Sequence, residues 1–240
     1  MLVQCDAAQL EWRTAVLLSN DPVGIKELND STIDTHANNQ KELVLPSRLI
    51  AKIFLFRTIF RGSGWAFARD PDFAHVSSDP DYWEERNARF YSKYAGLDQT
   101  HQQWFARVAE RKPIIGPTGR SWKIDLVEKR GQLIVPITQA ANYPVQGTGA
   151  DIMMIARLSF FRRIKERGWS DVLLVSTVHD SIVVDCPESR IREVAKLFHE
   201  VFNDLPKNFQ KLFNVKMSIP FPCETKFGHN LGEMEKIEFN

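Results

Sequence analysis

Short runs of apolar residues predict the β-strands of this chain. Leu2–Cys5 forms one such run and ends at Asp6. Residues 172–175 and 182–184 form two more runs on either side of a short polar turn, a pattern typical of a hairpin. Met217–Pro220 and Cys223–Gly228 are apolar or alternating, and they predict the last strands before an irregular tail.

Longer segments repeat their apolar residues every three or four positions, which predicts helices. These segments are residues 9–18, 46–61, 81–94, 99–111, 142–167 and 188–202. The intervening stretches are polar or rich in glycine and proline: 30–39 is a loop with a helix start, 62–64 breaks a helix, 70–80 is a loop, and 113–124 is a hairpin. The pattern therefore predicts a chain that contains both strands and helices.

The composition is that of a globular protein. The 240 residues are 43% hydrophobic and 25% charged, with a formal net charge of +1. That length is enough for one sizeable domain or two small ones. Because the net charge is close to zero, a nucleic-acid partner would have to bind a local basic face.

Cysteine usage and hydropathy exclude some other classes of protein. The three cysteines, Cys5, Cys186 and Cys223, are odd in number and widely spaced, so neither a zinc site nor a disulfide framework follows. We expect a reducing compartment. No apolar run reaches the roughly 18 residues of a membrane span, and the first residues do not have the pattern of a signal peptide.

Two carboxylates lie where strands end. Asp6 follows the first strand and precedes a helix, and Asp180 lies in the turn of the predicted hairpin. The ends of strands often carry the chemistry of a sheet, and a rigid hairpin tip is a good place to hold a metal. Each residue also has a plain structural interpretation, Asp6 as a helix cap and Asp180 as a turn residue.

A stripe of cations and aromatic rings winds along the predicted helix 46–61. Its members recur every fourth residue: Arg48, Lys52, Phe56 and Phe60. Two cations one turn apart repel unless an anion bridges them; a polyphosphate is such an anion, and a Phe ring can stack on a base. The alternative is an amphipathic helix with snorkelling basic side chains. Arg57 and Arg61 add charge on another face, which could contact a nucleic-acid backbone.

Four motifs in a particular order carry a family resemblance. They are Asp6-x4-Glu11-x-Arg13 after a strand, Arg48-x3-Lys52-x3-Phe56 on a helix, Asn142-x-Pro-x-Gln146-Gly-Thr opening a long helix, and Val178-His179-Asp180 in a hairpin. From Val3 to Glu233 the chain resembles the polymerase half of the DNA polymerase I family (family A). One motif could occur by chance, but four in this order are specific.

The resemblance implies an α+β architecture. It predicts a polymerase palm, formed by an antiparallel sheet with helices packed on one face, and a mainly helical fingers subdomain. Residues 1–35 would be the first part of the palm, 36–137 the fingers and 138–240 the second part of the palm. Helix 46–61 would be the nucleotide-binding helix.

The resemblance also implies the chemistry. Asp6 and Asp180 would be catalytic and, with the backbone carbonyl of Ala7, would bind two Mg²⁺ ions, for which Mn²⁺ is a substitute. Deoxynucleoside triphosphates would be held by Arg48, Lys52, Phe56, Glu11, His36 and Gln9. Primer-template DNA would be contacted by Arg13, Phe60, Asn142, Gln146 and His179.

Several positions depart from the family pattern. Ser181 replaces the usual Glu after His-Asp, which puts metal affinity or fidelity in question. Phe60 replaces the usual Tyr and Arg61 the usual Gly, which makes the template-side pocket less certain. Phe56, where some members have Tyr, suggests discrimination against dideoxynucleotides.

The chain starts about five residues before the first motif, and the resemblance therefore predicts neither a thumb nor an exonuclease domain. We expect a second polypeptide to supply a thumb and a 3′–5′ exonuclease, as in a phage-type split polymerase; a fragment of a longer polymerase is the alternative. We expect no membrane partner and a cytoplasmic location, in the host if a phage encodes the chain. Two other functions stay open: a catalytically weakened DNA-binding subunit and a single-subunit RNA polymerase-like enzyme.

Overall fold

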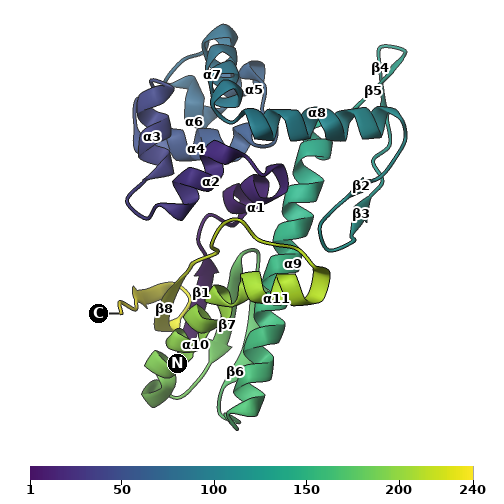
Figure 1. The fold of residues 1–240 in the computed structure, drawn as a ribbon. Coiled ribbons are helices and arrows are strands. Elements are labelled where there is room, and N and C mark those ends of the chain that lie inside the picture. Colours follow the sequence, from purple (N-terminus) through teal and green to yellow (C-terminus); the bar gives the residue numbers. More distant parts are fainter. Residues whose placement is uncertain (240) are drawn as a thin grey trace. The chain divides into compact units, whose positions relative to one another are not determined.

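The computed structural model describes residues 1–239 and has an α+β fold (Figure 1). The chain divides into two compact units, one made of Met1–Leu10 with the residues from Thr148 onward, the other of Glu11–Gly147. We describe each unit by itself. The predicted boundaries at residues 35 and 137 concern functional subdomains and stay predictions.

The first unit contains a five-stranded antiparallel sheet. Its strands, in spatial order, are β6 (Leu173–Val178), β7 (Ser181–Asp185), β1 (Leu2–Ala7), β8 (Cys223–Asn230) and β9 (Glu233–Lys236). The helical elements of this unit are the greater part of α9 (Ile137–Glu166), the short 3₁₀ helix Glu188–Arg190, α10 (Ile191–Asn203) and α11 (Leu205–Phe213).

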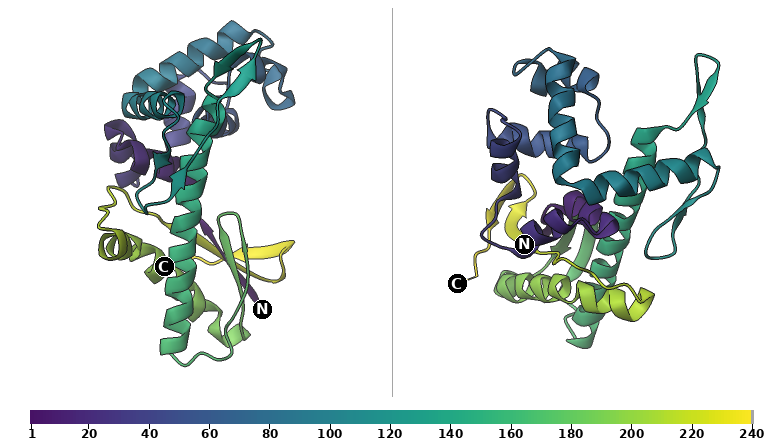
Figure 2. Two further views of the ribbon diagram at one scale, coloured as in Figure 1. Left: turned by 90° about the vertical axis from the view of Figure 1, so that its right-hand side faces the viewer. Right: turned by 45° about the horizontal axis from the view of Figure 1, so that its top comes forward.

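Alternation along the strands gives the sheet one apolar face. Val3 and Cys5 of β1 and Ile182 and Val184 of β7 are fully buried. α10 packs against β1 and β8, as Figures 1 and 2 show, and its Phe198 stacks on Phe160 of α9 with ring centroids 4.1 Å apart. An antiparallel sheet covered on one face leaves its polar positions on the other, and Asp6 is one of these positions.

The second unit is mainly helical. Its helices are α1 (Leu10–Ser19, from Glu11 onward), α2 (Pro22–Asn29), α3 (Thr35–Glu42), α4 (Arg48–Thr58), α5 (Gly64–Arg69), α6 (Pro71–Ala74), α7 (Pro80–Lys93), α8 (Ala95–Ala109) and the first turns of α9. Two small hairpins follow α8: β2 (Ile114–Ile115) with β3 (Ser121–Trp122), and β4 (Val127–Lys129) with β5 (Gln132–Ile134).

Aromatic residues fill the core of this helical unit. Phe54 of α4 lies among the rings of Phe67, Trp83 and Phe90, with centroid separations of 5.1, 5.9 and 6.4 Å. All four side chains are almost fully buried. α4 is therefore fixed by its buried face, and its opposite face is open to solvent.

Several predicted elements differ from the observed ones. α4 ends at Thr58 and not near Arg61, so Phe60 lies in the turn that follows the helix. Met217–Pro220 is an irregular segment and not a strand. Its apolar pattern reflects the burial of the Met217 and Ile219 side chains in the core. The predicted loop 70–80 contains α6, which Asp70 caps and Pro71 starts.

Other elements were not predicted at all. They are α2, α5, α11, β9 and the β4–β5 hairpin, together with the first turn of α9, which begins at Ile137 and not at Asn142. Within residues 1–239, none of the helices combines the length and the apolarity that a membrane span needs.

Candidate active site

The sheet brings the two predicted metal-binding carboxylates to neighbouring positions. β1 pairs with β7 so that Asp6 lies opposite Ser181, the residue that follows Asp180. The backbone N–H of Ala7 donates a hydrogen bond of 2.9 Å to the carbonyl of Asp180. Two carboxylates that are 174 positions apart in the chain thus belong to adjacent backbone segments of one unit.

The turn between β6 and β7 explains why Asp180 is presented to solvent. Val178 pairs with Ser181, so His179 and Asp180 form a two-residue loop. His179 has a φ of 52°, in the left-handed region that such tight turns require. Both loop residues are exposed.

Ser181, the substitute for the usual Glu, has a structural role here. Its side-chain hydroxyl donates a hydrogen bond of 3.0 Å to the carbonyl of Val178 and so closes the turn. Only 4% of the residue is exposed. Ser181 therefore supplies no third carboxylate beside Asp6 and Asp180.

Asp6 lies in a locally acidic environment. Partial burial raises the pKa of its carboxyl, and the charges of Asp180 and Glu224 raise it further. A hydrogen bond of 3.0 Å from the side-chain amide of Gln4 and the charge of Lys226 oppose this rise. A divalent cation between Asp6 and Asp180 would relieve their repulsion.

This donor set suits Mg²⁺, which is commonly bound by one or two carboxylates together with water and substrate phosphates. Within residues 1–239, no cluster of three or more His, Cys, Asp or Glu side chains could enclose a metal. Asp6 and Asp180 would thus form an open site, whose remaining positions are left for the substrate. The carbonyl of Ala7 stays a predicted ligand.

The predicted nucleotide-binding residues of α4 lie on its open face. Ser47 caps the helix by accepting a hydrogen bond from the N–H of Ile50. Arg48 and Lys52 are exposed and Phe56 is half-buried. The Nε of Arg48 donates a hydrogen bond of 2.6 Å to a carboxylate oxygen of Asp34, at the start of α3.

His36 lies beside this helix. Its imidazole centroid is 6.2 Å from that of Phe56, and only 2% of the residue is exposed. Burial lowers the pKa of His36 to about 4, and the charges of Arg48 and Lys52 act in the same direction. The imidazole is therefore neutral at pH 7. The structure brings four predicted nucleotide-binding residues together: Arg48, Lys52, Phe56 and His36.

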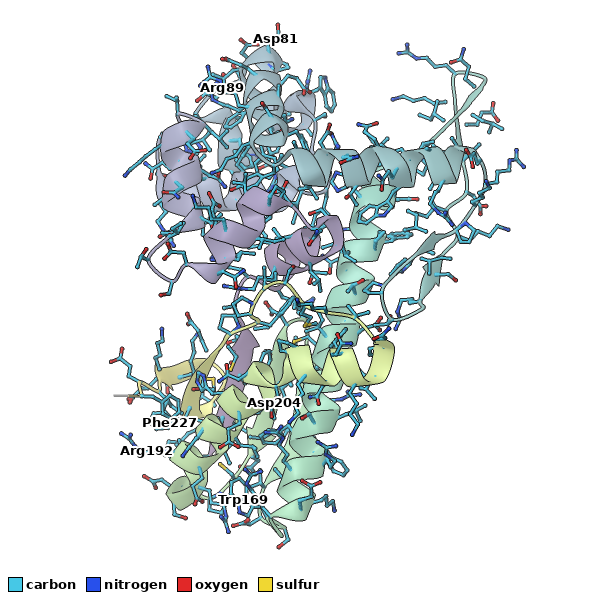
Figure 3. All side chains as sticks on the ribbon, in the orientation of Figure 1. Asp81, Arg89, Trp169, Arg192, Asp204 and Phe227 are labelled. Atoms are coloured by element: carbon cyan, nitrogen blue, oxygen red, sulfur yellow. The ribbon has the colours of Figure 1, made fainter. Side chains whose placement is uncertain are left out.

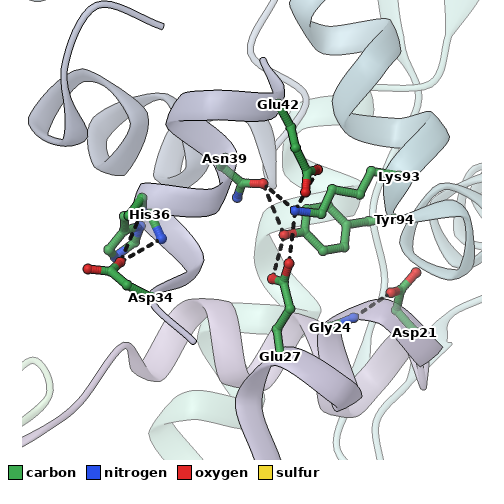
Figure 4. A network of polar contacts seen from close by, with 10 residues as sticks. Asp21, Gly24, Glu27, Asp34, His36, Asn39, Glu42, Lys93 and Tyr94 are labelled. Atoms are coloured by element: carbon green, nitrogen blue, oxygen red, sulfur yellow. Dashed lines mark hydrogen bonds and ion pairs between the residues drawn. The ribbon is translucent and has the colours of Figure 1, made fainter. Parts of the chain in front are cut away.

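A buried polar network supports α3, which carries His36 (Figure 4). The Lys93 ammonium contacts Glu27 at 2.8 Å and Glu42 at 2.9 Å. The Tyr94 hydroxyl donates to Glu27 at 2.8 Å and lies 3.1 Å from the side-chain oxygen of Asn39. α2, α3 and the α7–α8 junction are joined by these contacts, so the backbone that carries His36 is rigidly placed.

Arg57 and Arg61, the other two arginines predicted near α4, form ion pairs within the protein. Arg57 pairs with Asp70 and Asp72, and Arg61 pairs with Asp98. Nearby carboxylates thus pair with both guanidinium groups, and a contact of Arg57 or Arg61 with a nucleic-acid backbone stays a prediction.

Arg61 also has an unusual backbone. Its φ is 61°, which explains why glycine is usual at this position of the family. Its Nε donates to Nδ1 of His101 at 2.9 Å, and its guanidinium lies 3.7 Å from the ring centroid of Tyr91. These contacts offset the cost of the left-handed conformation.

Glu11 and Gln146 meet in the second unit. The side-chain amide of Gln146, on α9, donates a hydrogen bond to the carboxylate of Glu11, on α1. Asn142 lies one helical turn before Gln146. Arg13, on α1, is mostly buried, and burial lowers its pKa to about 10. Glu11 and Gln146 are 135 positions apart in the sequence and belong to two different motifs, and the fold brings their side chains into contact.

The remaining predicted residues are placed as follows. Gln9 has a φ of 54° between β1 and α1, and its side-chain oxygen is buried without a hydrogen-bond partner in residues 1–239. His179 is exposed in the β6–β7 turn. Phe60 is half-buried after α4. Their proposed contacts with nucleotide or DNA stay predictions.

Some residues of the site were missed by sequence reasoning. Glu224 lies opposite Asp6 on β8, and Lys226 lies two positions further on the same face. Alternation in residues 223–228 shows which residues share a face, but register between distant strands has no local signal. Asp34 could have been found as an N-cap before a helix, since it accepts hydrogen bonds from the N–H groups of His36 and Ala37.

Comparison with known proteins gives a consistent result. The model of the family "DNA polymerase family A" matches residues 1–233. The DNA polymerase of Bacillus phage SP01 is 24% identical over 97% of this chain and 26% of that protein. DNA polymerase I of Aquifex aeolicus is 25% identical over 81% of this chain and 34% of that protein.

The thermostable DNA polymerase I of Thermus aquaticus is 27% identical over 84% of this chain and 24% of that protein. This chain thus spans about a quarter to a third of the length of these curated relatives.

The fold matches a solved structure as well. The POL domain of Pol1 from M. smegmatis, in complex with DNA primer-template and dNTP, superposes with a TM-score of 0.78 at 16% identity. The match covers 95% of this chain and 39% of that one. The α+β architecture, the order of the four motifs and the match to the family model lead to one conclusion: the chain belongs to DNA polymerase family A.

Proposed function

We propose that this chain is the catalytic part of a DNA-directed DNA polymerase, which adds deoxynucleotides to a primer 3′ end as a template directs. The observation that carries the proposal is the placement of Asp6 and Asp180 on adjacent backbone segments of the sheet, with Asp180 contributing to the raised pKa of Asp6. Family membership supports it. The sheet would belong to the palm, residues 1–35 and 138–240, and the helices within residues 36–137 would form the fingers.

Asp6 and Asp180 would hold two Mg²⁺ ions, or Mn²⁺ in their place. When bound, such ions lower the pKa of an attacking hydroxyl and stabilise the charge on the phosphoryl group and on the leaving group. The side chains then need little acid–base chemistry of their own. Their task is to hold the metals, the primer end and the triphosphate in place.

Arg48 and Lys52 would hold the triphosphate. They are exposed one turn apart at the start of α4, and no other cation of α4 is both exposed and near His36 in the part of the chain described. Phe56 would pack on the sugar and base of the nucleotide, and neutral His36 would donate a hydrogen bond to a phosphate oxygen. Gln9 is proposed to contact the same nucleotide.

Glu11 would limit the space at the sugar 2′ position and so exclude ribonucleotides. Its hydrogen bond from Gln146 supports a fixed orientation of the carboxylate. Arg13, Phe60, Asn142, Gln146 and His179 would contact primer or template near the new base pair. The preference for deoxynucleotides separates this proposal from an RNA polymerase-like enzyme.

We further propose that full activity needs a second polypeptide with a thumb and a 3′–5′ exonuclease. DNA that is held by few phosphate contacts binds weakly, so that added salt soon reduces the binding below a useful level. We expect extension by the isolated chain to be distributive at low salt and to gain salt tolerance with the partner that co-purifies from the native host. Full, salt-resistant activity of the isolated chain would contradict this proposal.

A primer-extension assay tests the polymerase proposal. Four primed templates that differ only in the first unpaired base are each offered the four deoxynucleotides and the four ribonucleotides singly, with Mg²⁺. We expect each template to direct its complementary deoxynucleotide, and Glu11→Ala to increase the use of ribonucleotides. Binding of primed DNA without extension, by the chain alone and with its partner, would favour the weakened DNA-binding subunit.

A further inference from the structure

The β4–β5 hairpin, residues 127–134, forms an arm that contains no buried residue. All six strand residues are exposed, including Val127, Leu133 and Ile134. Figures 1 and 2 show the two strands extending past the end of α8. A two-stranded hairpin is marginally stable in water by itself, and exposed apolar side chains of this kind indicate an interaction surface.

The arm lies in a basic part of the chain. Residues 111–130 contain six basic and two acidic residues, a net charge of +4, whereas the whole chain carries +1. Four of these cations are exposed and have no ion pair in the part of the chain that the structure describes: Arg111, Lys123, Lys129 and Arg130.

Elsewhere in the helical unit, five cations are paired with carboxylates: Arg48 with Asp34, Arg57 with Asp70, Arg61 with Asp98, Arg89 with Glu85, and Lys93 with Glu27. Lys26, Lys41, Lys52 and Arg69 are exposed and have no ion pair within residues 1–239. Unpaired cations thus occur at several places in the unit, and four of them lie in the arm or in the segments that lead to it. The complement of these four is an anionic partner.

The geometry of the tip places two cations together. Lys129 pairs with Gln132, which leaves Arg130 and Gly131 as a two-residue turn. Their φ angles are 54° and 77°, both in the left-handed region. This turn follows the right-handed twist of the strands and presents the Lys129 and Arg130 side chains at the far end of the arm.

We propose that the β4–β5 arm binds the phosphate backbone of duplex DNA through Lys129 and Arg130, with its apolar side chains against the sugars. A two-stranded ribbon fits the major groove of B-DNA. Single strands are held chiefly by stacking on aromatic rings, and residues 127–134 include no aromatic residue. The contact goes beyond the proposed catalytic function, because it needs neither a primer end nor a nucleotide.

A double variant, Lys129→Gln/Arg130→Asn, removes the charge and keeps the turn, since Asn-Gly is a preferred sequence for this turn. Binding to a labelled blunt-ended duplex of about 20 bp is measured by fluorescence anisotropy, without nucleotide or divalent metal, over a series of salt concentrations. We expect affinity at low salt to fall on the order of tenfold, and the slope of log K against log salt to decrease in magnitude by about 2.

Two further variants serve as controls. Lys41→Gln/Arg89→Gln removes the same charge from exposed positions of α3 and α7 in the same unit (Arg89 is labelled in Figure 3), and should leave the slope unchanged. Lys129→Arg/Arg130→Lys keeps the charge and should bind like the wild type. Lys129→Glu leaves both turn residues intact, and should lose affinity even if the double variant folds poorly.

The outcomes are distinct. The proposal is overturned if the slope of log K against log salt is unchanged in both Lys129→Gln/Arg130→Asn and Lys129→Glu, or if the Lys41→Gln/Arg89→Gln control loses as much affinity as the arm variant. It is also overturned if the arm variant loses as much affinity for a single-stranded oligonucleotide as for the duplex, or if polyglutamate displaces the labelled duplex as well as unlabelled duplex does. None of these results depends on polymerase activity, so failure of the polymerase proposal is recognised separately, from the primer-extension assay.

Discussion

Asp34 binds Arg48 and caps α3 with the same carboxylate group. One oxygen accepts a hydrogen bond of 2.6 Å from Nε of Arg48, and the other accepts from the backbone N–H groups of His36 and Ala37. The Arg48 side chain holds the pKa of Asp34 below its usual range. Within residues 1–239 only the Nε of Arg48 is bonded, so its two terminal nitrogens can bind an anion.

Asp34→Asn should weaken nucleotide binding with little effect on the rate of chemistry. Asn caps a helix as well as Asp does, so α3 is kept and only the charge that orients Arg48 is lost. The side chains of Arg48 and Asp34 are 54% and 43% exposed, so we expect an increase in the KM for deoxynucleotide of up to about fivefold.

Asp30→Asn is the matched control for Asp34→Asn, because Asp30 is an exposed carboxylate nearby that bonds only to Thr32. Binding of a fluorescent deoxynucleotide at equilibrium gives a readout without catalysis. If Asp34→Asn and Asp30→Asn have the same nucleotide affinity, Asp34 does not position Arg48.

Arg61→Gly should destabilise the fold, although glycine suits the left-handed backbone. Gly recovers about 1 kcal/mol of conformational cost, but the bonds of Arg61 to Asp98 and His101 contribute more, since hydrogen bonds of charged groups are worth about 1.5–3 kcal/mol each. We expect a net loss of about 2 kcal/mol in the free energy of unfolding. Urea denaturation measures it, and a gain in stability would show that strain at Arg61 dominates.

Acidification should destabilise the helical unit through its buried histidines. Burial, with the Arg61 charge, lowers the pKa of His101 to about 3 from the usual 6.5. The unfolded chain therefore binds a proton at a higher pH than the folded chain does. The stability that neutral His101 provides is complete above pH 6.5 and is lost as the pH falls toward 3. His36, with its pKa of about 4, acts in the same direction.

His101→Asn should reduce this pH dependence, because Asn offers Arg61 a hydrogen-bond acceptor and cannot be protonated. Urea unfolding at pH 7.5 and pH 5 should show a smaller difference for His101→Asn than for the wild type. An equal difference in the two proteins would mean that His101 does not stay neutral in the fold.

Divalent metal should stabilise the wild-type sheet unit through Asp6 and Asp180. Without metal, Asp6→Asn should melt at a higher temperature than the wild type, since it removes a partly buried charge whose pKa is raised by burial first and then by the charges of Asp180 and Glu224. Added Mn²⁺ should raise the melting temperature of the wild type and of Asp185→Asn, a control on β7, but not that of Asp6→Asn. Equal shifts in all three proteins would place the metal elsewhere.

Local patterns in the sequence were sufficient for the elements that carry the site. Alternation and turn chemistry predicted β1, β7 and the turn at Asp180, and apolar spacing predicted α4. The sequence predicts that α4 continues to Arg61, because residues 59–61 continue its apolar and basic pattern. The helix ends at Thr58, and Arg61 takes a left-handed conformation that its contacts with Asp98 and His101 stabilise. That compensation comes from α8 and is invisible in the local sequence.

Contacts between distant segments could not be predicted in the same way. The pairing of Asp6 with Glu224 depends on the register of β1 and β8, and the Asp34–Arg48 pair depends on how α3 packs on α4. The family resemblance, and not any local pattern, predicts that Asp6 and Asp180 belong to one site. It gave no indication of the β4–β5 arm, whose exposed strands depart from amphipathic patterning.

The most direct test of the account is the extension of a primed template by Asp6→Asn and Asp180→Asn, beside the wild type and Asp185→Asn, with whatever co-purifies from the native host present. Removing either ligand of a metal pair should reduce the rate of deoxynucleotide addition by three or more orders of magnitude, while Asp185→Asn extends normally. Extension by both Asp6→Asn and Asp180→Asn within about tenfold of the wild-type rate would contradict the assignment of the active site.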